Sequence, residues 1–368
     1  MGTLYKALPY VAVSFLISFC LTPLVKKIGL AIDAYAIENE RTVHHGRIVR
    51  IGGVAMYTAF IIAMAIFVHP DSTFNAIIIG SLIVFLGGLL DDMFDLGAGV
   101  KLGFQLAGAL YVIIFGQIQL VEMNLAFFTV NISSINYLVS LFWIVGVTNA
   151  INLIDGLDGL SSGISIIVLC VIGFIGYQMR RIDAAIVCLI LIGAVGGVLS
   201  FNFHPASIFV GDCGAQFMGF MIACLSLLGF KSSTFVSLLF PLIILFIPLA
   251  DTCLAIIRRK LNGQKISEAD KSHLHHVLMF KIGLSHRNTV LLLYLVTTLF
   301  AGDALLMFFN QKAGTIMLIA LCLVAWLFIE LTGMIRKDFH PLIGLCRKLT
   351  GHPKKSKDAR FDANKIKD

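Results

Sequence analysis

Eleven apolar stretches follow one another along the chain, each close to the roughly 20 residues that a helix needs to cross a bilayer. They cover residues 8–25, 51–69, 73–90, 101–116, 136–151, 160–178, 183–200, 213–229, 234–256, 288–309 and 314–335. Hydrophobic residues make up 58% of the 368 residues and charged residues only 13%, against about 25% charged residues in soluble domains. A water-soluble core cannot bury this much apolar surface. The sequence therefore predicts an all-α integral membrane protein with about eleven transmembrane helices.

The same composition excludes several other classes of protein. So apolar a chain is neither disordered nor a coiled coil. Its eight cysteines form no C-x-x-C pair and most lie in the apolar stretches, which predicts packing residues rather than disulfides or a zinc site. The net charge of +7 does not point to nucleic acid, because the basic residues collect in particular loops.

The basic residues also predict the orientation of the chain. When the stretches alternate across a membrane, most of the 28 Lys and Arg residues fall in the loops of one side, which the positive-inside rule makes cytoplasmic. The N-terminus is then outside and the C-terminus inside. Residues 117–135 are too polar to span and predict an outer loop with a short hairpin. We expect a polytopic catalytic domain over 1–335 and a basic cytoplasmic tail over 336–368.

Carboxylates, amides and imidazoles gather on the predicted cytoplasmic side. They comprise Asp91 and Asp92 after the third stretch, Asn149, Asn152, Asp155 and Asp158 after the fifth, His204 and Asp212 before the eighth, Asp251 in the ninth, His273, His275 and His276 in the largest loop, and Arg50 in the first loop. Solvated helix ends explain one such residue but not this concentration. The pattern predicts an active site at the cytoplasmic surface of the membrane.

Two short motifs carry the strongest chemical signal. In the run N-A-I-N-L-I-D-G-L-D-G-L over 149–160, Asn152 and Asp155 are three residues apart and share a helix face. The Asp-Gly steps favour a break in the helix, and such oxygen ligands suit Mg²⁺ together with a phosphate. In F-V-G-D-C-G over 209–214, Asp212 stands at a helix start, where its carboxylate could cap the helix. The glycines on either side would also let a phosphate approach the backbone N–H groups at the helix N-terminus.

Two further clusters leave alternatives open. Adjacent carboxylates at a span end, Asp91 and Asp92, are costly unless a cation or a function offsets them. The sequence H-L-H-H over 273–276 could suggest zinc, but no fourth soft ligand is near it in the sequence. A hydrogen-bonding clamp for phosphate or sugar is the favoured interpretation, with Arg258, Arg259 and Lys260 adding positive charge.

These motifs, in this order and spacing, resemble those of the polyprenyl-phosphate N-acetylhexosamine-1-phosphate transferases. The resemblance covers about residues 20–335. The H-x-H-H form is similar to the branch that transfers GlcNAc-1-phosphate in the synthesis of common antigen, O-antigen and teichoic acid. The resemblance implies Mg²⁺ as cofactor, with Mn²⁺ as an alternative ion.

The resemblance also implies a role for each motif residue. Asp91 and Asp92 would be catalytic and handle the lipid phosphate, and Asp212 and Asn152 would bind the metal. The nucleotide would be held by Asp155, Asp158, Phe209 and Asn149, and the sugar and phosphate by His273, His275, His276 and Arg50.

The implied function is transfer of GlcNAc-1-phosphate from a UDP-sugar, UDP-GlcNAc, to undecaprenyl phosphate, at the cytoplasmic face of a bacterial plasma membrane. The alternatives are a related transferase that uses UDP-MurNAc-pentapeptide or UDP-GalNAc and, from another class, a secondary transporter. Transporters place charged groups near the midplane between internal repeats, whereas here they lie at one face. A homodimer is left open, and no nucleic-acid partner is expected.

Overall fold

The structure is a computed structural model of the chain, and it describes residues 2–36, 47–119, 122–125, 128–131, 135–229, 239–261, 263 and 273–334. The predicted tail, 336–368, lies outside these residues. The chain forms two compact units, Met1–Leu318 and Ile319–Asp368. The first unit contains all of the predicted site residues.

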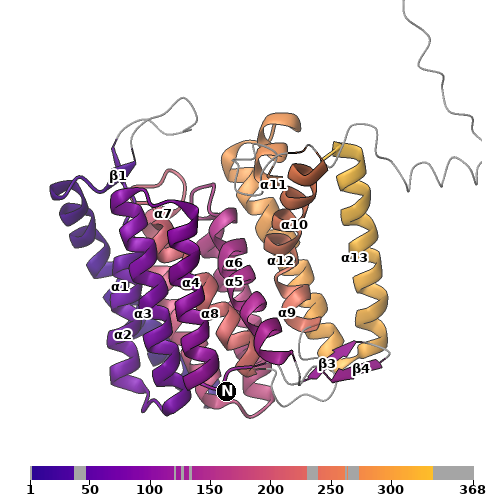
Figure 1. Ribbon diagram of the computed structural model, residues 1–368, viewed down its shortest axis with the longest axis horizontal. Coiled ribbons are helices and arrows are strands. Elements are labelled where there is room, and N and C mark those ends of the chain that lie inside the picture. The colour runs from indigo at the N-terminus through magenta and orange to yellow at the C-terminus, as the bar shows by residue number, and fades with distance from the viewer. Residues whose placement is uncertain are drawn as a thin grey trace, which may run out of the picture. The chain divides into compact units, whose positions relative to one another are not determined.

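Helices account for nearly all of the regular structure (Figure 1). The first five helices are α1 (Gly2–Ala31), α2 (Gly53–Phe67), α3 (Ser72–Phe94), α4 (Ala98–Phe115) and α5 (Asn136–Ile154). They are followed by α6 (Leu160–Gln178), α7 (Ile182–Asn202), α8 (Gly211–Gly229), α9 (Leu239–Ile244), α10 (Phe246–Leu261), α11 (Leu274–His276), the π-helical turn η1 (Val277–Lys281), α12 (His286–Phe309) and α13 (Gln311–Thr332). The prediction of an all-α membrane protein is confirmed.

Within the described residues, nine helices are long and apolar enough to cross a membrane. Two of the eleven predicted spans are not among these nine. Helix α2 has only 15 residues, and the stretch predicted as one span over 234–256 contains two helices, α9 and α10. The break has a local cause, because Pro248 has no N–H to donate to the carbonyl of Ile244. The total number of crossings remains a prediction.

Helix α8 lies at the centre of the first unit, where it packs against α2, α3, α5 and α6. Its Phe217 and Phe220 are fully buried. Side chains on the outside of the unit are also apolar, among them Leu16, Ile114 and Phe142, which are more than half exposed. In a membrane these residues face lipid, so the exposure of large apolar side chains agrees with the composition.

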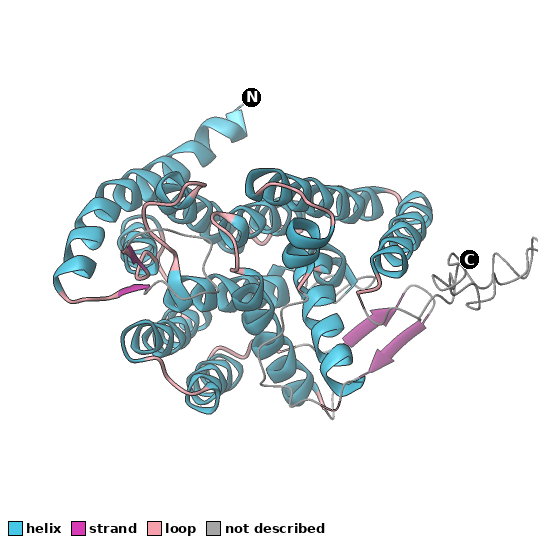
Figure 2. Ribbon diagram, turned by 90° about the horizontal axis from the view of Figure 1, so that it is seen from above, coloured by secondary structure: helices cyan, strands magenta, loops and turns pink. Residues whose placement is uncertain are grey.

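Two short antiparallel hairpins lie at opposite ends of the unit (Figure 1). β1 (Tyr35–Ala36) pairs with β2 (Ile48–Val49) at the end that also carries α11, and β3 (Glu122–Leu125) pairs with β4 (Phe128–Asn131) at the end where the N-terminus lies. The second pair confirms the hairpin expected in the segment 117–135. Figure 2 views the helices from the end that carries β1 and α11. The predicted site residues lie at this end.

Candidate active site

The candidate site lies where α3 and α5 end and α8 begins (Figure 1). Residues from four loops and helix ends surround a cavity of about 220 Å³. Its lining consists of Arg50, Asp92, Asn152, Asp155, Gly156, Leu157, Asp158, Asn202, Phe209, Val210, Gly211 and Asp212. Seven of these twelve were predicted as site residues, so the structure brings together motifs that are far apart in the sequence.

Main-chain hydrogen bonds join the segment before α8 to the segment before α2. The N–H of Phe209 donates to the carbonyl of Val49 at 2.8 Å, and the N–H of Gly52 donates to the carbonyl of Phe209 at 2.9 Å. A third bond runs from the N–H of Gly53 to the carbonyl of Val210 at 2.8 Å. The backbones approach so closely that a Cβ on Gly52 would lie 2.6 Å from the Phe209 carbonyl oxygen.

Gly211 opens α8 with a φ of +75°, a left-handed conformation that favours glycine. A Cβ there would also overlap the carbonyl oxygen of Arg50 and approach a carboxylate oxygen of Asp92. The glycine of the F-V-G-D-C-G motif is therefore required by backbone geometry. It turns the chain so that Asp212 begins the helix beside the end of α3.

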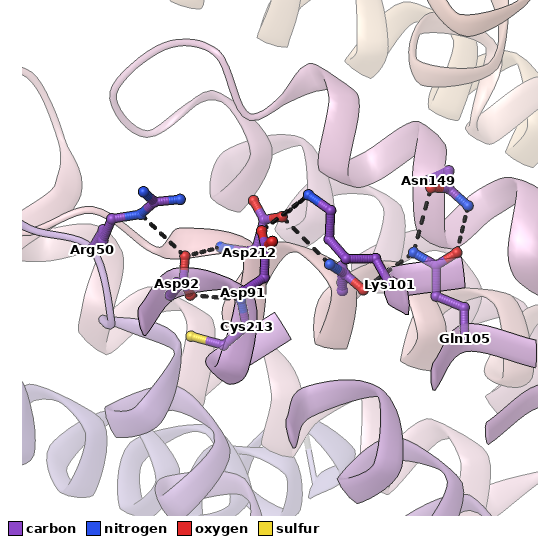
Figure 3. A network of polar contacts seen from close by, with 9 residues as sticks. Arg50, Asp91, Asp92, Lys101, Gln105, Asn149, Asp212 and Cys213 are labelled. Carbon is purple, nitrogen blue, oxygen red and sulfur yellow. Dashed lines mark hydrogen bonds and ion pairs between the residues drawn. The ribbon is translucent and has the colours of Figure 1, made fainter. Parts of the chain in front are cut away.

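Asp92 caps the start of α8 from the end of α3 (Figure 3). Its two carboxylate oxygens accept hydrogen bonds from the backbone N–H groups of Asp212 and Cys213, both at 2.9 Å. The Arg50 Nε lies 3.4 Å from the same carboxylate. A negative charge at a helix N-terminus is favourable, so Asp92 holds the first turn of α8, and with it Asp212, in place.

Lys101, in the first turn of α4, lies between the other two carboxylates (Figure 3). Its Nζ is 3.0 Å from Asp91 Oδ2 and 3.0 Å from Asp212 Oδ2. Asp91 is only 2% exposed, and its Oδ1 is buried without a hydrogen-bond partner. Buried carboxylate oxygens are normally satisfied. This side of the site therefore holds the Lys101 ammonium between two carboxylates, and Asp91 Oδ1 is available to a further ligand.

A chain of amides continues from Asp212 into the bundle. Gln216 Nε2 lies 3.5 Å from Asp212 Oδ2, and the Gln105 amide donates to Gln216 Oε1 at 3.1 Å. Gln105 in turn accepts a 2.6 Å hydrogen bond from Asn149 (Figure 3). Asn149 thus belongs to this network between α4, α5 and α8, and it is not among the residues that line the cavity.

The loop between α5 and α6 carries the other two carboxylates. Asp155 follows the last residue of α5 and accepts a hydrogen bond from the Ser161 hydroxyl. Burial raises the pKa of Asp155 to about 7, with the charges of Asp212 and Asp158 adding to the shift. Asp158 is nearly fully buried; its Oδ2 lies 2.8 Å from His204 Nδ1 and accepts a 3.2 Å hydrogen bond from the N–H of Ala206.

The H-L-H-H segment reaches the edge of the cavity through one histidine. A Cβ on Gly156 would lie 2.5 Å from the His275 Nε2, so the ring packs directly on the lining residue Gly156. Burial lowers the pKa of His275 to about 3, which keeps this imidazole neutral. His273 points instead to α10, where its Nδ1 lies 2.8 Å from Asp251 Oδ2. His273 and His276 do not line the cavity.

Among the residues that were not predicted, three add polar side chains to the site or to the network beside it. Lys101 looks in the sequence like one more basic residue beside a span, although it follows the Asp91-Asp92 pair closely. Asn202 lines the cavity and ties two loops together, because it accepts from the N–H of Gly159 at 3.1 Å and donates to the carbonyl of Ile208 at 3.0 Å. Gln105 has no sequence signal beyond being an amide in an apolar helix.

The chain is similar to curated enzymes over most of its length. The sequence profile of glycosyl transferase family 4 matches residues 74–230, which include most of α3, the loop after α5 and all of α8. A probable undecaprenyl-phosphate N-acetylglucosaminyl 1-phosphate transferase of Bacillus subtilis is 39% identical over 351 residues, covering 92% of this chain and 95% of the relative.

More distant relatives have related names. The decaprenyl-phosphate N-acetylglucosaminephosphotransferase of Mycobacterium leprae is 31% identical over 82% of this chain and 84% of its own length. The undecaprenyl-phosphate alpha-N-acetylglucosaminyl 1-phosphate transferase of Escherichia coli K12 is 27% identical, over 82% and 83% respectively. The resemblance found in the motifs is thereby confirmed, and the chain belongs to glycosyl transferase family 4, among the polyprenyl-phosphate N-acetylhexosamine-1-phosphate transferases.

Proposed function

We propose that this chain transfers GlcNAc-1-phosphate from UDP-GlcNAc to undecaprenyl phosphate. A phosphate oxygen of the lipid bonds to the phosphorus that carries the sugar, and the bond from that phosphorus to the bridging oxygen breaks. The products are UMP and a lipid-linked sugar pyrophosphate. Family membership supports the reaction class. The structural observation that carries the proposal is the cluster of Asp91, Asp212 and Lys101 beside a cavity lined with oxygen donors.

The residues at this position fit Mg²⁺. Asp91 and Asp212 already share one cation, the Lys101 ammonium, and Asp91 Oδ1 is buried without a hydrogen-bond partner. All of the donors are carboxylate or amide oxygens, which Mg²⁺ prefers. We propose that Asp212 and Asp91 hold the ion, with Asn152 in the cavity lining beside them. When bound, Mg²⁺ would neutralise the pyrophosphate and stabilise charge on the departing UMP.

The surrounding protein groups position the reacting phosphates. The carboxylate of Asp92 is engaged by two backbone N–H groups, which argues for a positioning role and against its acting as a nucleophile. Lys101 and Arg50 supply positive charge on two sides of Asp212 and Asp92. A phosphate monoester with a second pKa near 6 is mostly dianionic at neutral pH. We therefore favour direct attack by the lipid phosphate over a covalent aspartyl intermediate.

The rest of the cavity is proposed to hold the nucleotide and the sugar. Asp155, Asp158 and Phe209 line the side formed by the α5–α6 loop and the segment before α8, and we assign them to the uridine. His275 lies against Gly156 at the edge of the cavity, and we assign it to the sugar phosphate. A neutral imidazole there can donate and accept hydrogen bonds without adding charge.

Release of UMP by the purified protein tests the proposal. We expect UMP from UDP-GlcNAc only when undecaprenyl phosphate is present, and much less UMP from UDP-GalNAc or UDP-MurNAc-pentapeptide. Faster release from either of the other donors would reassign the sugar. Uptake of a UDP-sugar into sealed vesicles without UMP formation would instead support a transporter.

The proposal also includes the setting, a bacterial plasma membrane with the site on its cytoplasmic face, serving a cell-envelope polysaccharide. Lys281 of η1 and Asp183 in the first turn of α7 are both exposed. Asn202, the last residue of α7, lines the cavity, so Asp183 lies at the end of this helix that is away from the site. The background should lack Cys20, Cys170 and Cys253, which are the exposed cysteines among the described residues, and also Cys346, which lies outside them. In this background, a membrane-impermeant maleimide applied to intact cells should label Asp183→Cys and spare Lys281→Cys. The reverse pattern would invert the orientation.

A further inference from the structure

One carboxylate and two imidazoles form a cluster that shares Asp158 with the lining of the cavity. Asp158 comes from the α5–α6 loop, His204 from the segment after α7, and His286 is the first residue of α12. One ligand atom from each residue lies within 4.8 Å of the others. Three separate parts of the chain thus converge on one point.

The internal geometry of this cluster is compact. His204 Nδ1 lies 2.8 Å from Asp158 Oδ2, and the rings of His204 and His286 are stacked with centroids 4.1 Å apart and planes 17° from parallel. Ligands around a tetrahedral zinc ion, with bonds of about 2.0–2.1 Å, lie roughly 3.3 Å from one another. Because imidazole lone pairs lie in the ring plane, the more exposed His204 ring would also have to rotate out of the stack. Such a rotation, with shifts of about an ångström, would bring the three donors into the coordination sphere of one ion.

The donor set distinguishes this cluster from the proposed Mg²⁺ position. Two imidazoles and a carboxylate match the three protein ligands of zinc sites that keep a fourth position for water, whereas Mg²⁺ prefers oxygen donors. Within the described residues, the H-L-H-H histidines do not form a comparable group of three. Among the described residues, Asp158, His204 and His286 are therefore better candidates for zinc ligands than the H-L-H-H histidines.

The burial of the three residues also fits a bound ion. The Asp158 side chain is 1% exposed and His286 8% exposed, so two of the ligands are fixed by the surrounding protein. The His204 side chain is 37% exposed and leaves a path from solvent. Pre-positioned ligands together with an entry path are what a functional metal site requires.

We propose that Asp158, His204 and His286 form a binding site for a transition-metal ion of the Zn²⁺ class. The ion joins the α5–α6 loop, the α7–α8 connection and the N-terminus of α12. Because Asp158 also lines the cavity, the ion and a ligand in the cavity share this carboxylate.

Metal binding to the purified full-length chain tests this site without any transferase assay, so the result is independent of the proposed reaction. The protein is stripped with a chelator and kept in excess Mg²⁺, which fills sites of oxygen donors. Zn²⁺ is then titrated in competition with a chromophoric indicator, and Co²⁺ is titrated while its visible absorption is followed. We expect one tight Zn²⁺ equivalent and the intense Co²⁺ bands of a tetrahedral site.

The variants His204→Gln and His286→Gln should each lose this equivalent. Losing a direct ligand should weaken Zn²⁺ binding by at least the roughly 100-fold that loss of an outer-shell partner can cost. His69→Gln, which removes an exposed imidazole between α2 and α3, should bind like the unmodified chain. Unchanged titrations in the folded variants, or no tight Zn²⁺ in the unmodified chain, would overturn the site. His204 is partly exposed, so its variant decides the question even if His286→Gln does not fold.

Discussion

Lys101 Nζ and Asp212 Oδ2 lie 3.0 Å apart, and the same ammonium lies 3.0 Å from Asp91 Oδ2. The lysine thus occupies the position that we propose for Mg²⁺ and must move aside when the ion binds. We expect its ammonium group then to contact the phosphates. The Lys101 side chain would thus neutralise charge in both states. Without the ion it compensates Asp91 and Asp212, and with the ion and substrate bound it would compensate the negative charge of the substrate.

This arrangement makes Lys101→Met a test of the shared position. We expect kcat to fall by ~10²-fold, the scale of losing one preorganised electrostatic contact. The Mg²⁺ concentration for half-maximal activity should decrease, because no ammonium competes for the carboxylates. Lys312→Met, at an exposed position of α13, serves as the control and should change neither quantity. A higher Mg²⁺ requirement in Lys101→Met would contradict the shared position.

Asp212 should be the least replaceable carboxylate of the chain. Asp212→Asn keeps the shape of the side chain but removes its charge, and we expect UMP release to fall by about 10²-fold or more. Raised Mg²⁺ should recover part of the activity. Asp95→Asn is the matched control, because Asp95 ends α3 on the same side of the molecule but is exposed. Near-normal turnover and Mg²⁺ dependence in Asp212→Asn would rule out Asp212 as a metal ligand.

Gly211→Ala should destabilise the protein and lower activity together. The left-handed φ of +75° costs a residue with a Cβ roughly 1–2 kcal/mol, and the Cβ would also displace the Arg50 backbone. Gly99→Ala, inside α4 with nothing within 4 Å of the added Cβ, should be neutral or stabilising. Thermal unfolding in detergent measures both variants. Equal unfolding temperatures for Gly211→Ala and Gly99→Ala would show that the turn before α8 can accommodate a Cβ.

The buried His275 predicts a pH dependence of stability. Its pKa is lowered to about 3 in the folded chain, against about 6.5 when unfolded. Between these values the unfolded chain binds more protons, so acidification below about pH 6.5 destabilises the fold by up to about 1.4 kcal/mol per pH unit. The unfolding temperature of His275→Gln should therefore fall less steeply from pH 7 to pH 4 than that of the unmodified chain. Parallel pH profiles would refute a buried neutral histidine.

The apolar pattern of the sequence was sufficient to place most helices. The stretch predicted over 160–178 is α6, Leu160–Gln178, because a helix that crosses lipid is a run of mostly apolar residues bounded by polar ones. The interrupted stretch before α10 was harder, since hydropathy does not register a helix break. Pro248 was the signal that could have located it.

The site was predictable where a motif is local and unpredictable where packing creates it. The cavity brings together Asp92, Asp155 and Phe209 as the motifs predicted, because each stands at a helix end on the same side. Lys101 could not be distinguished from an ordinary flanking lysine without knowing that α4 packs on α3. Asn149 repeats the polar spacing of Asn152, yet its position one turn earlier on α5 directs it to Gln105. The stacking of His204 on His286 depends entirely on tertiary structure.

The bonds between Val49, Gly52 and Phe209 use only backbone atoms. The frame of the site is therefore insensitive to most side-chain exchanges, provided that the glycines remain. If the turn before α8 binds phosphate as we propose, exchanges of lining side chains would change the sugar or base that is accepted while this turn keeps its shape. When the backbone holds the frame and side chains line the cavity, relatives can come to prefer different sugar donors while the frame stays unchanged. Leu157 and Phe209 line the cavity and are the positions at which we would change the donor preference.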